Sequence, residues 1–284
     1  MVNWFKTMLL FVALAAVLML VGGAVMGRRG LLIGLAISLA INFFSYWFSD
    51  KIVLKSYRAQ PLGEAEAPRV HAVLAQLCQA AGIPKPPLYR IPDSSPNAFA
   101  TGRNPDHAAV CVTDGILELL DEEELKGVLG HELAHVKHRD ILIGTMAASI
   151  AAVIMFVSSI ARWGFMFGGY GGDRDRGGGN PLALLVAAIV APIAALLIQM
   201  AISRSREYDA DEGGARFAGS PYGLASALKK LQATSARIPL KASPATAHMF
   251  IVKPFTGGGL FALFSTHPPM EKRIARLMEM RGAT

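Results

Sequence analysis

The chain has 284 residues, of which 52% are hydrophobic and only 17% are charged, and its mean hydropathy is +0.39. This composition excludes an ordinary soluble globular domain, because the apolar residues gather in a few long runs instead of spreading along the chain. The net charge of +7 fits a protein held near anionic lipid headgroups, and no nucleic-acid-binding motif accompanies it.

Four stretches carry no charged side chain and predict membrane-spanning helices. They are Thr7–Gly27, Gly30–Ser49, Ile141–Ala161 and Gly177–Ser203, the last with its apolar part at Pro181–Ile202. Each can cross a hydrocarbon core, which takes about 20 apolar residues in a helix. The first run is longer than the roughly 7–15 apolar residues of a signal peptide, and the second follows it almost at once. We therefore expect an uncleaved hairpin of two spans.

The spans divide the chain into two transmembrane hairpins and two soluble segments. In chain order these are the first hairpin at 1–49, with spans at 7–27 and 30–49, a soluble segment at 50–140, the second hairpin at 141–203, with spans at 141–161 and 181–202, and a soluble segment at 204–284. Two crossings return the chain to its starting side, so both soluble segments lie on one side of the membrane. More Lys and Arg residues flank the spans on that side than on the other, which favours the cytoplasm. Cys78 and Cys111 are isolated and lack CxxC spacing, as expected in a reducing compartment.

The first soluble segment predicts helices at both ends and short strands between them. Apolar residues recur with helical spacing over Pro68–Ala81, and glycine and proline follow as stop signals. Strands are expected at Leu88–Ile91, Asn97–Gly102 and His107–Thr113. Asp121 precedes three glutamates, a combination that favours the start of a helix. We expect that helix to run through Arg139, and it could continue into the third span.

The segment GHELAHVKHRD, residues 130–140, carries half of a metal site. On a helix, His131 and His135 lie one turn apart and project from one face, so both imidazoles can reach one ion. Glu132 lies about 100° around the helix, near enough to act on a metal-bound water but not arranged as a ligand. This HExxH spacing lets Zn²⁺ and a carboxylate activate water together. The alternative is a charged surface helix with solvated histidines.

The third ligand is expected in SRSREYDADEGGA, residues 203–215. Glu207 and Asp211 are four apart and share a helical face, so Glu207 can bind metal while Asp211 orients a histidine ring. If the third and fourth spans pack as an antiparallel pair, their ends bring Glu207 to the two histidines. A solvated acidic face is the alternative for this segment. A site of three histidines, with His138 in place of Glu207, also stays open.

Several motifs in order resemble the HtpX family of membrane-integrated zinc metallopeptidases, relatives of the CAAX prenyl protease. The resemblance covers essentially the whole chain. Besides the two leading spans, it is carried by NAFATGRNPDHAAVCVTDGIL (97–117), EEELKGVLGHELAHVKHRD (122–140), SRSREYDADEGGA (203–215), AHMFI (247–251) and STHPPMEKRI (265–274).

The resemblance implies an α+β membrane protein with four transmembrane helices and a cytoplasmic, mainly helical gluzincin-type metallopeptidase domain containing a small β-sheet. It implies one Zn²⁺ per subunit, with His131, His135 and Glu207 as ligands and Glu132 as catalytic base. It further implies a bacterial inner-membrane location, the bilayer and protein substrates as partners, and degradation of damaged or misassembled membrane proteins under stress. Oligomeric state is not encoded in these motifs.

Peptide hydrolysis also calls for a second oxyanion donor. His267 is the first candidate for this catalytic role, ahead of Tyr208 and His248. Arg273 is interpreted as pairing with a carboxylate within the fold, in preference to binding substrate. The strand around Ala108–Val112 is expected to offer an edge to which an extended substrate adds, with Asn97 or Phe99 beside the cleft.

Two other functional classes were weighed against a protease. A membrane chaperone or scaffold with structural zinc is opposed by Glu132, because a structural site needs no base and is closed by four protein ligands. A transporter is opposed by the spans themselves, which contain no internal charge, whereas ionisable residues within spans normally mark a transport path.

Overall fold

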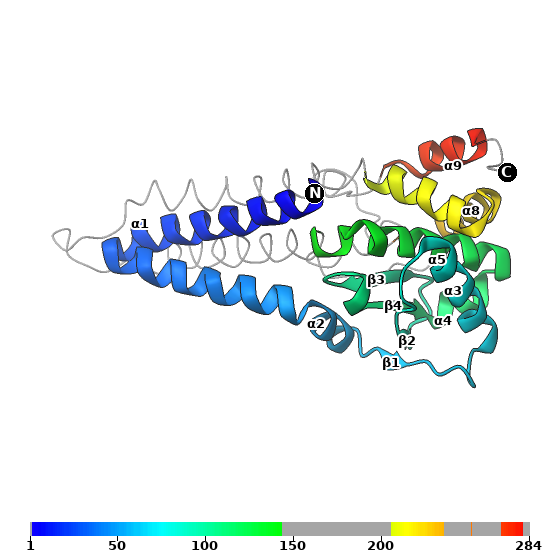
Figure 1. Cartoon of the computed structure of the whole chain (residues 1–284), viewed down its shortest axis with the longest axis horizontal. Helices are drawn as coiled ribbons and strands as arrows, with labels where there is room; N and C mark the ends of the chain where they lie inside the picture. Colours follow the sequence, from blue (N-terminus) through cyan, green and yellow to red (C-terminus); the bar gives the residue numbers. More distant parts are fainter. Residues whose placement is uncertain (1, 144–205, 236–250, 252–267, 281–284) are drawn as a thin grey trace, which may run out of the picture. The chain divides into compact units, whose positions relative to one another are not determined.

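The computed structural model describes residues 2–143, 206–235, 251 and 268–280 (Figure 1). The expected fourth span, all but the first three residues of the third, His248 and His267 lie outside these ranges. The chain divides into two compact units, residues 1–47 with 145–201, and residues 48–144 with 202–284.

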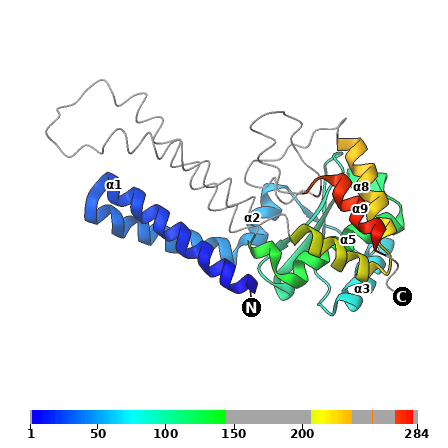
Figure 2. The same ribbon diagram turned by 90° about the horizontal axis from the view of Figure 1, so that it is seen from above.

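In the first unit, α1 (Val2–Trp47) is a helical hairpin that reverses at Gly27. Gly27 has φ 60°, a left-handed conformation that glycine adopts at little cost. The arms then meet backbone to backbone, since a methyl group on Gly30 would lie 1.8 Å from the carbonyl oxygen of Gly22 and one on Gly34 2.3 Å from that of Leu18. Figures 1 and 2 both show the two arms side by side. The reversal falls at the first residue of the Gly27–Gly30 segment where the sequence predicts it.

The second arm of α1 has the properties of a membrane span. Met26–Trp47 is the one helix in the described part of the chain that is long and apolar enough to cross a membrane, and Thr7–Leu20 in the first arm is a shorter apolar helix. Asn42 Nδ2 donates a hydrogen bond to the carbonyl oxygen of Phe11 at 3.3 Å. This polar contact joins the arms through side chain and backbone, as is common between apolar helices.

The second unit is a small mixed sheet with helices packed against it. Its elements are α2 (Ser49–Ser56), β1 (Gln60–Pro61), α3 (Pro68–Ala81), β2 (Leu88–Ile91), β3 (Ala98–Gly102), the 3₁₀ turn η1 (Pro105–His107), β4 (Ala108–Thr113), α4 (Asp114–Leu119), α5 (Glu122–His138), α8 (Tyr222–Ser235) and α9 (Met270–Glu279). Residues 206–218 are also helical. The predicted helix at Pro68–Ala81 and the three predicted strands are confirmed, with two of the strands starting one residue later.

The four strands lie in the order β1-β2-β4-β3. β4 pairs in parallel with β2 and antiparallel with β3. The expectation that Ala108–Val112 offers a free edge is therefore wrong, because both sides of β4 are paired. β3 lies at an edge of the sheet instead. Which strand is at the edge depends on pairing between residues far apart in the chain, so the local sequence pattern of β3 or β4 does not predict it.

The side chains on the two faces of the sheet pack into two different hydrophobic clusters. Leu88, Ala100 and Val110 join the main core, which contains buried residues of α3, α5 and α8. Phe99 and Cys111 point the other way and pack with Val53 of α2. Because neighbouring strand residues face opposite sides, Ala100 on β3 faces the side of α5 while Phe99 does not. Cys78 and Cys111 are both buried and unpaired.

α5 begins as expected and ends one residue early. Asp121 and Glu124 form a reciprocal capping box at its start. Glu124, buried, also accepts hydrogen bonds from Ser226 Oγ at 2.7 Å and Lys230 Nζ at 2.6 Å on α8. At the other end the expectation of a helix through Arg139 is wrong: Arg139 has φ 60°, and helical structure resumes at residues 140–143. A left-handed residue closes the helix by offering its N–H to the last carbonyls.

Candidate metal centre

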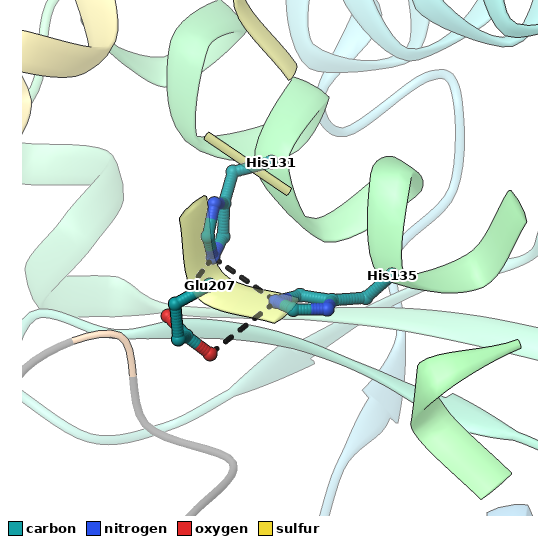
Figure 3. A group of neighbouring side chains, drawn as sticks. All are labelled: His131, His135 and Glu207. Atoms are coloured by element: carbon teal, nitrogen blue, oxygen red, sulfur yellow. Dashed lines mark hydrogen bonds and ion pairs between the residues drawn. The ribbon is translucent and has the colours of Figure 1, made fainter. Parts of the chain in front are cut away.

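α5 and the helix at residues 206–218 supply the candidate ligands. The two imidazoles of His131 and His135 project from the same face of α5, and Glu207 approaches from the other helix (Figure 3). His131 and Glu207 are buried, and His135 is half-buried. Within the described part of the chain, these three side chains form the one group of His, Cys, Asp and Glu that could hold a metal ion.

The donor atoms converge at distances that suit a single ion. His131 Nε2 lies 3.2 Å from His135 Nε2, and the Glu207 carboxylate oxygens lie 3.6 Å from His135 Nε2 and 3.7 Å from His131 Nε2. Ligands held tetrahedrally at zinc bond lengths stand about 3.3–3.5 Å apart. The donor set of two imidazoles and one carboxylate thus fits a zinc ion.

Each imidazole faces an aspartate with its other nitrogen. His131 Nδ1 is 2.9 Å from Asp211 Oδ1, and His135 Nδ1 is 3.3 Å from Asp140 Oδ2. A carboxylate accepts a hydrogen bond, so each Nδ1 carries the proton and each Nε2 presents a lone pair. Two lone pairs 3.2 Å apart repel unless a positive charge lies between them. The pocket therefore requires a metal ion there, or a proton in its place.

Arg273 of α9 is wholly buried and binds the carboxylate of Asp211, which lies behind the His131 ring. Its Nε and Nη2 donate to the two oxygens of Asp211 at 2.8 and 2.6 Å, and its Nη1 lies 3.4 Å from Glu207 Oε2. Burial alone would raise the pKa of Asp211, but Arg273 and His131 lower it to about 2. Arg273 is thus paired within the fold, in keeping with the structural interpretation of this residue.

Glu132 is buried beside the ligands and is held by the edge strand. Its Oε2 accepts a hydrogen bond of 3.0 Å from the backbone N–H of Ala100 on β3. Burial raises the pKa of Glu132 to about 7, with Glu207 adding to the rise and His135 opposing it. A carboxyl group with a pKa near neutrality is suited to accept and return a proton.

The histidines differ in their own protonation. Burial lowers the pKa of His131, and the nearby Arg273 lowers it further. Burial opposes the charged form of His135 as well, but the hydrogen bond to Asp140 and the carboxylates of Glu207 and Glu132 raise its pKa to about 9. Without a metal ion, these carboxylates therefore favour the protonated, positively charged form of His135.

The other candidates from the sequence lie elsewhere. His138 is exposed and is not among the three converging side chains. Tyr208 places its ring 4.8 Å from the Arg276 guanidinium. The buried Asn97 accepts a hydrogen bond from the Ile251 backbone N–H at 3.3 Å, and Phe99 packs on the opposite face of the sheet. His248 and His267 lie outside the described residues.

Sequence reasoning missed two contacts of this centre, Asp140 with His135 and Ala100 with Glu132. Asp140 follows His135 by five residues, which on an unbroken helix is about 140° away from it. Ala100 contributes through its backbone, so its side chain gives no signal.

Comparisons with known proteins identify the family of this chain. A family model described as peptidase family M48 matches residues 64–281. A protease HtpX homolog of Desulfatibacillum aliphaticivorans is 55% identical over 98% of this chain and 90% of its own length. One of Burkholderia thailandensis is 52% identical over 99% and 98%.

A solved structure shares the fold. The crystal structure of S. mikatae Ste24p superposes with a TM-score of 0.52 at 18% sequence identity. The match covers 87% of this chain and 57% of that one. At this low identity, the similarity indicates a shared fold and nothing further. The family model and the near full-length relatives together show that this chain belongs to peptidase family M48, among the protease HtpX homologs.

Proposed function

We propose that the chain is a membrane-bound, zinc-dependent endopeptidase that hydrolyses peptide bonds of misfolded or damaged membrane proteins. The observation that carries this proposal is the convergence of His131, His135 and Glu207 beside a buried Glu132. A structural zinc site would be closed by a fourth protein ligand. Here three donors meet next to a carboxylate with a pKa of about 7.

Each side chain of the centre has a separate task in this mechanism. His131, His135 and Glu207 would hold Zn²⁺, which supplies Lewis acidity when bound and lowers the pKa of water. Glu132 takes a proton from the attacking water and returns it to the departing amine. The Ala100 N–H fixes Glu132 Oε2, so that Oε1 is the oxygen placed to carry the proton. We assign the second oxyanion donor to His267.

The same proposal includes the arrangement in the membrane. Four spans, at residues 7–27, 30–49, 141–161 and 181–202, would anchor a catalytic domain of residues 50–140 and 204–284 in the bacterial inner membrane. The domain would face the cytoplasm, as the distribution of Lys and Arg around the spans favours. A centre held at the bilayer surface suits substrates that are themselves membrane proteins, and quality control under stress is the role that the HtpX relatives suggest.

The test compares metal content and proteolysis in the purified full chain and its variants. Glu132→Gln is expected to keep zinc and to lose about 10²–10⁴-fold in cleavage of casein or a membrane protein. Glu207→Ala is expected to lose the metal, while Glu212→Gln, an outward-facing change on the same helix, should leave both unchanged. Metal retained at wild-type affinity by Glu207→Ala would overturn the assignment of Glu207 as the third ligand.

A chaperone or scaffold with structural zinc is the competing function. It predicts that Glu132→Gln has no effect on any activity, because a scaffold does not use a base. Undiminished cleavage by the Glu132→Gln protein would refute the catalytic assignment. Suppression of substrate aggregation without cleavage by the wild-type protein would favour the scaffold.

A further inference from the structure

The two candidate histidine ligands have matching outer partners. On the side away from the candidate metal position, His131 contacts Asp211, and Asp211 in turn contacts Arg273. His135 is followed by Asp140, whose Oδ2 lies 3.3 Å from His135 Nδ1, and then by Arg206, whose Nη1 lies 3.8 Å from Asp140 Oδ1. Asp140 is 6% exposed and the Arg206 side chain 12%. Each ligand ring thus ends in an Asp–Arg pair. The Asp211–Arg273 pair is buried and hydrogen-bonded, whereas the Asp140 pair is a longer ionic contact to the half-buried Arg206.

The chain reaches this arrangement through an unfavourable backbone conformation. On a continuous helix Asp140 would point away from His135, by about 140°. Arg139 interrupts the helix at φ 60°, with its N–H bonded to the carbonyls of His135 and Val136. A residue with a side chain adopts this conformation at a cost that glycine avoids. The turn brings Asp140 back beside the ring, and such strain is concentrated at functional positions.

Arg206 connects the same carboxylate to the third candidate ligand. It directly precedes Glu207 in the sequence, and burial lowers its pKa while Asp140 and Glu207 oppose that change. The 3.8 Å contact of Arg206 with Asp140 is an ion pair without a hydrogen bond, and it joins the start of the helix at residues 206–218 to the end of α5. The contact therefore links the helix that carries Glu207 with the carboxylate that contacts His135.

We propose that Asp140, held in place by Arg206, is a positioning residue for His135. It keeps the proton on Nδ1, directs Nε2 at the ion and increases the basicity of that nitrogen, as an outer carboxylate does for a metal-bound imidazole. Asp211 does the same for His131. The inference rests on the proposed function, because it concerns the affinity of the same centre for its metal.

The test measures metal affinity in the full-length protein in detergent, by chelator competition with Zn²⁺ and with Co²⁺ at one fixed pH. Asp140→Asn is expected to weaken binding 10–100-fold and to shift the visible absorption bands of the Co²⁺-loaded protein. Once saturated with metal, it should show a lower kcat with little change in KM. Arg206→Gln should shift affinity in the same direction by a smaller factor. Asp209→Asn, an exposed change beside Glu207, is the matched control and should match the wild type.

The outcomes separate this inference from the proposed function. If Asp140→Asn binds both metals as the wild type does, with an unshifted cobalt spectrum, while Asp211→Asn is weakened, then Asp140 only supports the fold and the inference is wrong. If Asp140→Asn does not fold, Arg206→Gln decides, and an unchanged affinity there overturns the inference. If the wild type binds no metal, or His131→Ala binds it equally well, the proposed function itself fails.

Discussion

Gly214 lies against the backbone of His131, with no room for a side chain between them. A methyl group on Gly214 would lie 2.5 Å from the His131 backbone nitrogen and 2.7 Å from its Cα. Glu207, Asp211 and Gly214 recur at helical spacing, so one face of the helix presents a ligand, an outer carboxylate and a close backbone contact. The reach of Glu207 to the histidines is thus set by how closely two helix backbones approach.

This contact predicts that Gly214→Ala separates the two helices. Because the methyl group meets backbone atoms that cannot rotate away, we expect a loss of about 1–3 kcal/mol in stability together with weaker metal binding. Thermal unfolding and chelator competition would measure the two effects. Gly213→Ala is the milder comparison on the same helix, since its methyl group would lie 3.1 Å from the Ala134 Cβ and not within 3.0 Å of the backbone, so it should lose less of both. Equal behaviour of the two variants would contradict the special role of Gly214.

Removal of the buried guanidinium should be costly. Arg273→Gln leaves the Asp211 carboxylate buried without its bidentate partner, a defect that costs about 3–5 kcal/mol in stability. The unfolding midpoint of the variant should fall well below that of Lys272→Gln, an exposed change on the same helix. Adding Asp211→Asn should recover part of the stability, because the unpaired charge is then gone, but not the metal affinity. A midpoint equal to that of the control would contradict the pairing.

The link between α5 and α8 depends on Glu124. Glu124→Ala removes the partner of Ser226 and Lys230 and half of the capping box. Lys230 is exposed and stays hydrated, so the loss comes mainly from the Ser226 hydrogen bond and the capping box. It should be about 1 kcal/mol, read as a lower midpoint of chemical or thermal unfolding. Glu123→Ala, which takes an exposed acid from the same first turn, should change the midpoint much less. The prediction fails if the two variants unfold alike.

Metal affinity should rise with pH in a range set by His135. The pKa of this residue is raised from its ordinary 6.5 to about 9, so between these values the metal-free folded protein keeps a proton that an ion must displace. Apparent affinity should therefore increase about tenfold per pH unit from pH 7 and level off near pH 9, as expected when binding releases one proton.

The stability of the metal-free protein should change with pH in the opposite direction. The stabilisation from the raised pKa of His135 is complete below pH 6.5 and is lost as pH rises through about 9. Chelator competition and unfolding of the metal-free protein at pH 7, 8 and 9 would check both, and an affinity independent of pH would refute the prediction.

Elements with a local signal could be predicted from the amino-acid sequence. Hydrophobic spacing defined Pro68–Ala81, and the acids after Asp121 marked the start of α5. The four-residue spacings of His131 with His135 and of Glu207 with Asp211 placed each pair on one face of a helix, because an α-helix returns to the same face after about 3.6 residues. The expectation that Glu207 joins the two histidines came from antiparallel packing of the third and fourth spans and from the resemblance to the HtpX family.

Contacts between distant segments, or across a bend in the chain, could be known from the three-dimensional structure alone. β4 became an interior strand because β2 pairs with its second side, and this put Ala100 of β3 against Glu132. Asp140 reached His135 because Arg139 adopts a left-handed conformation. Gly214 determined how closely the two ligand-bearing helices approach. Local periodicity specifies which side chains share a face, whereas the distance between two faces depends on the packing of the whole unit, and no short stretch of sequence carries that information.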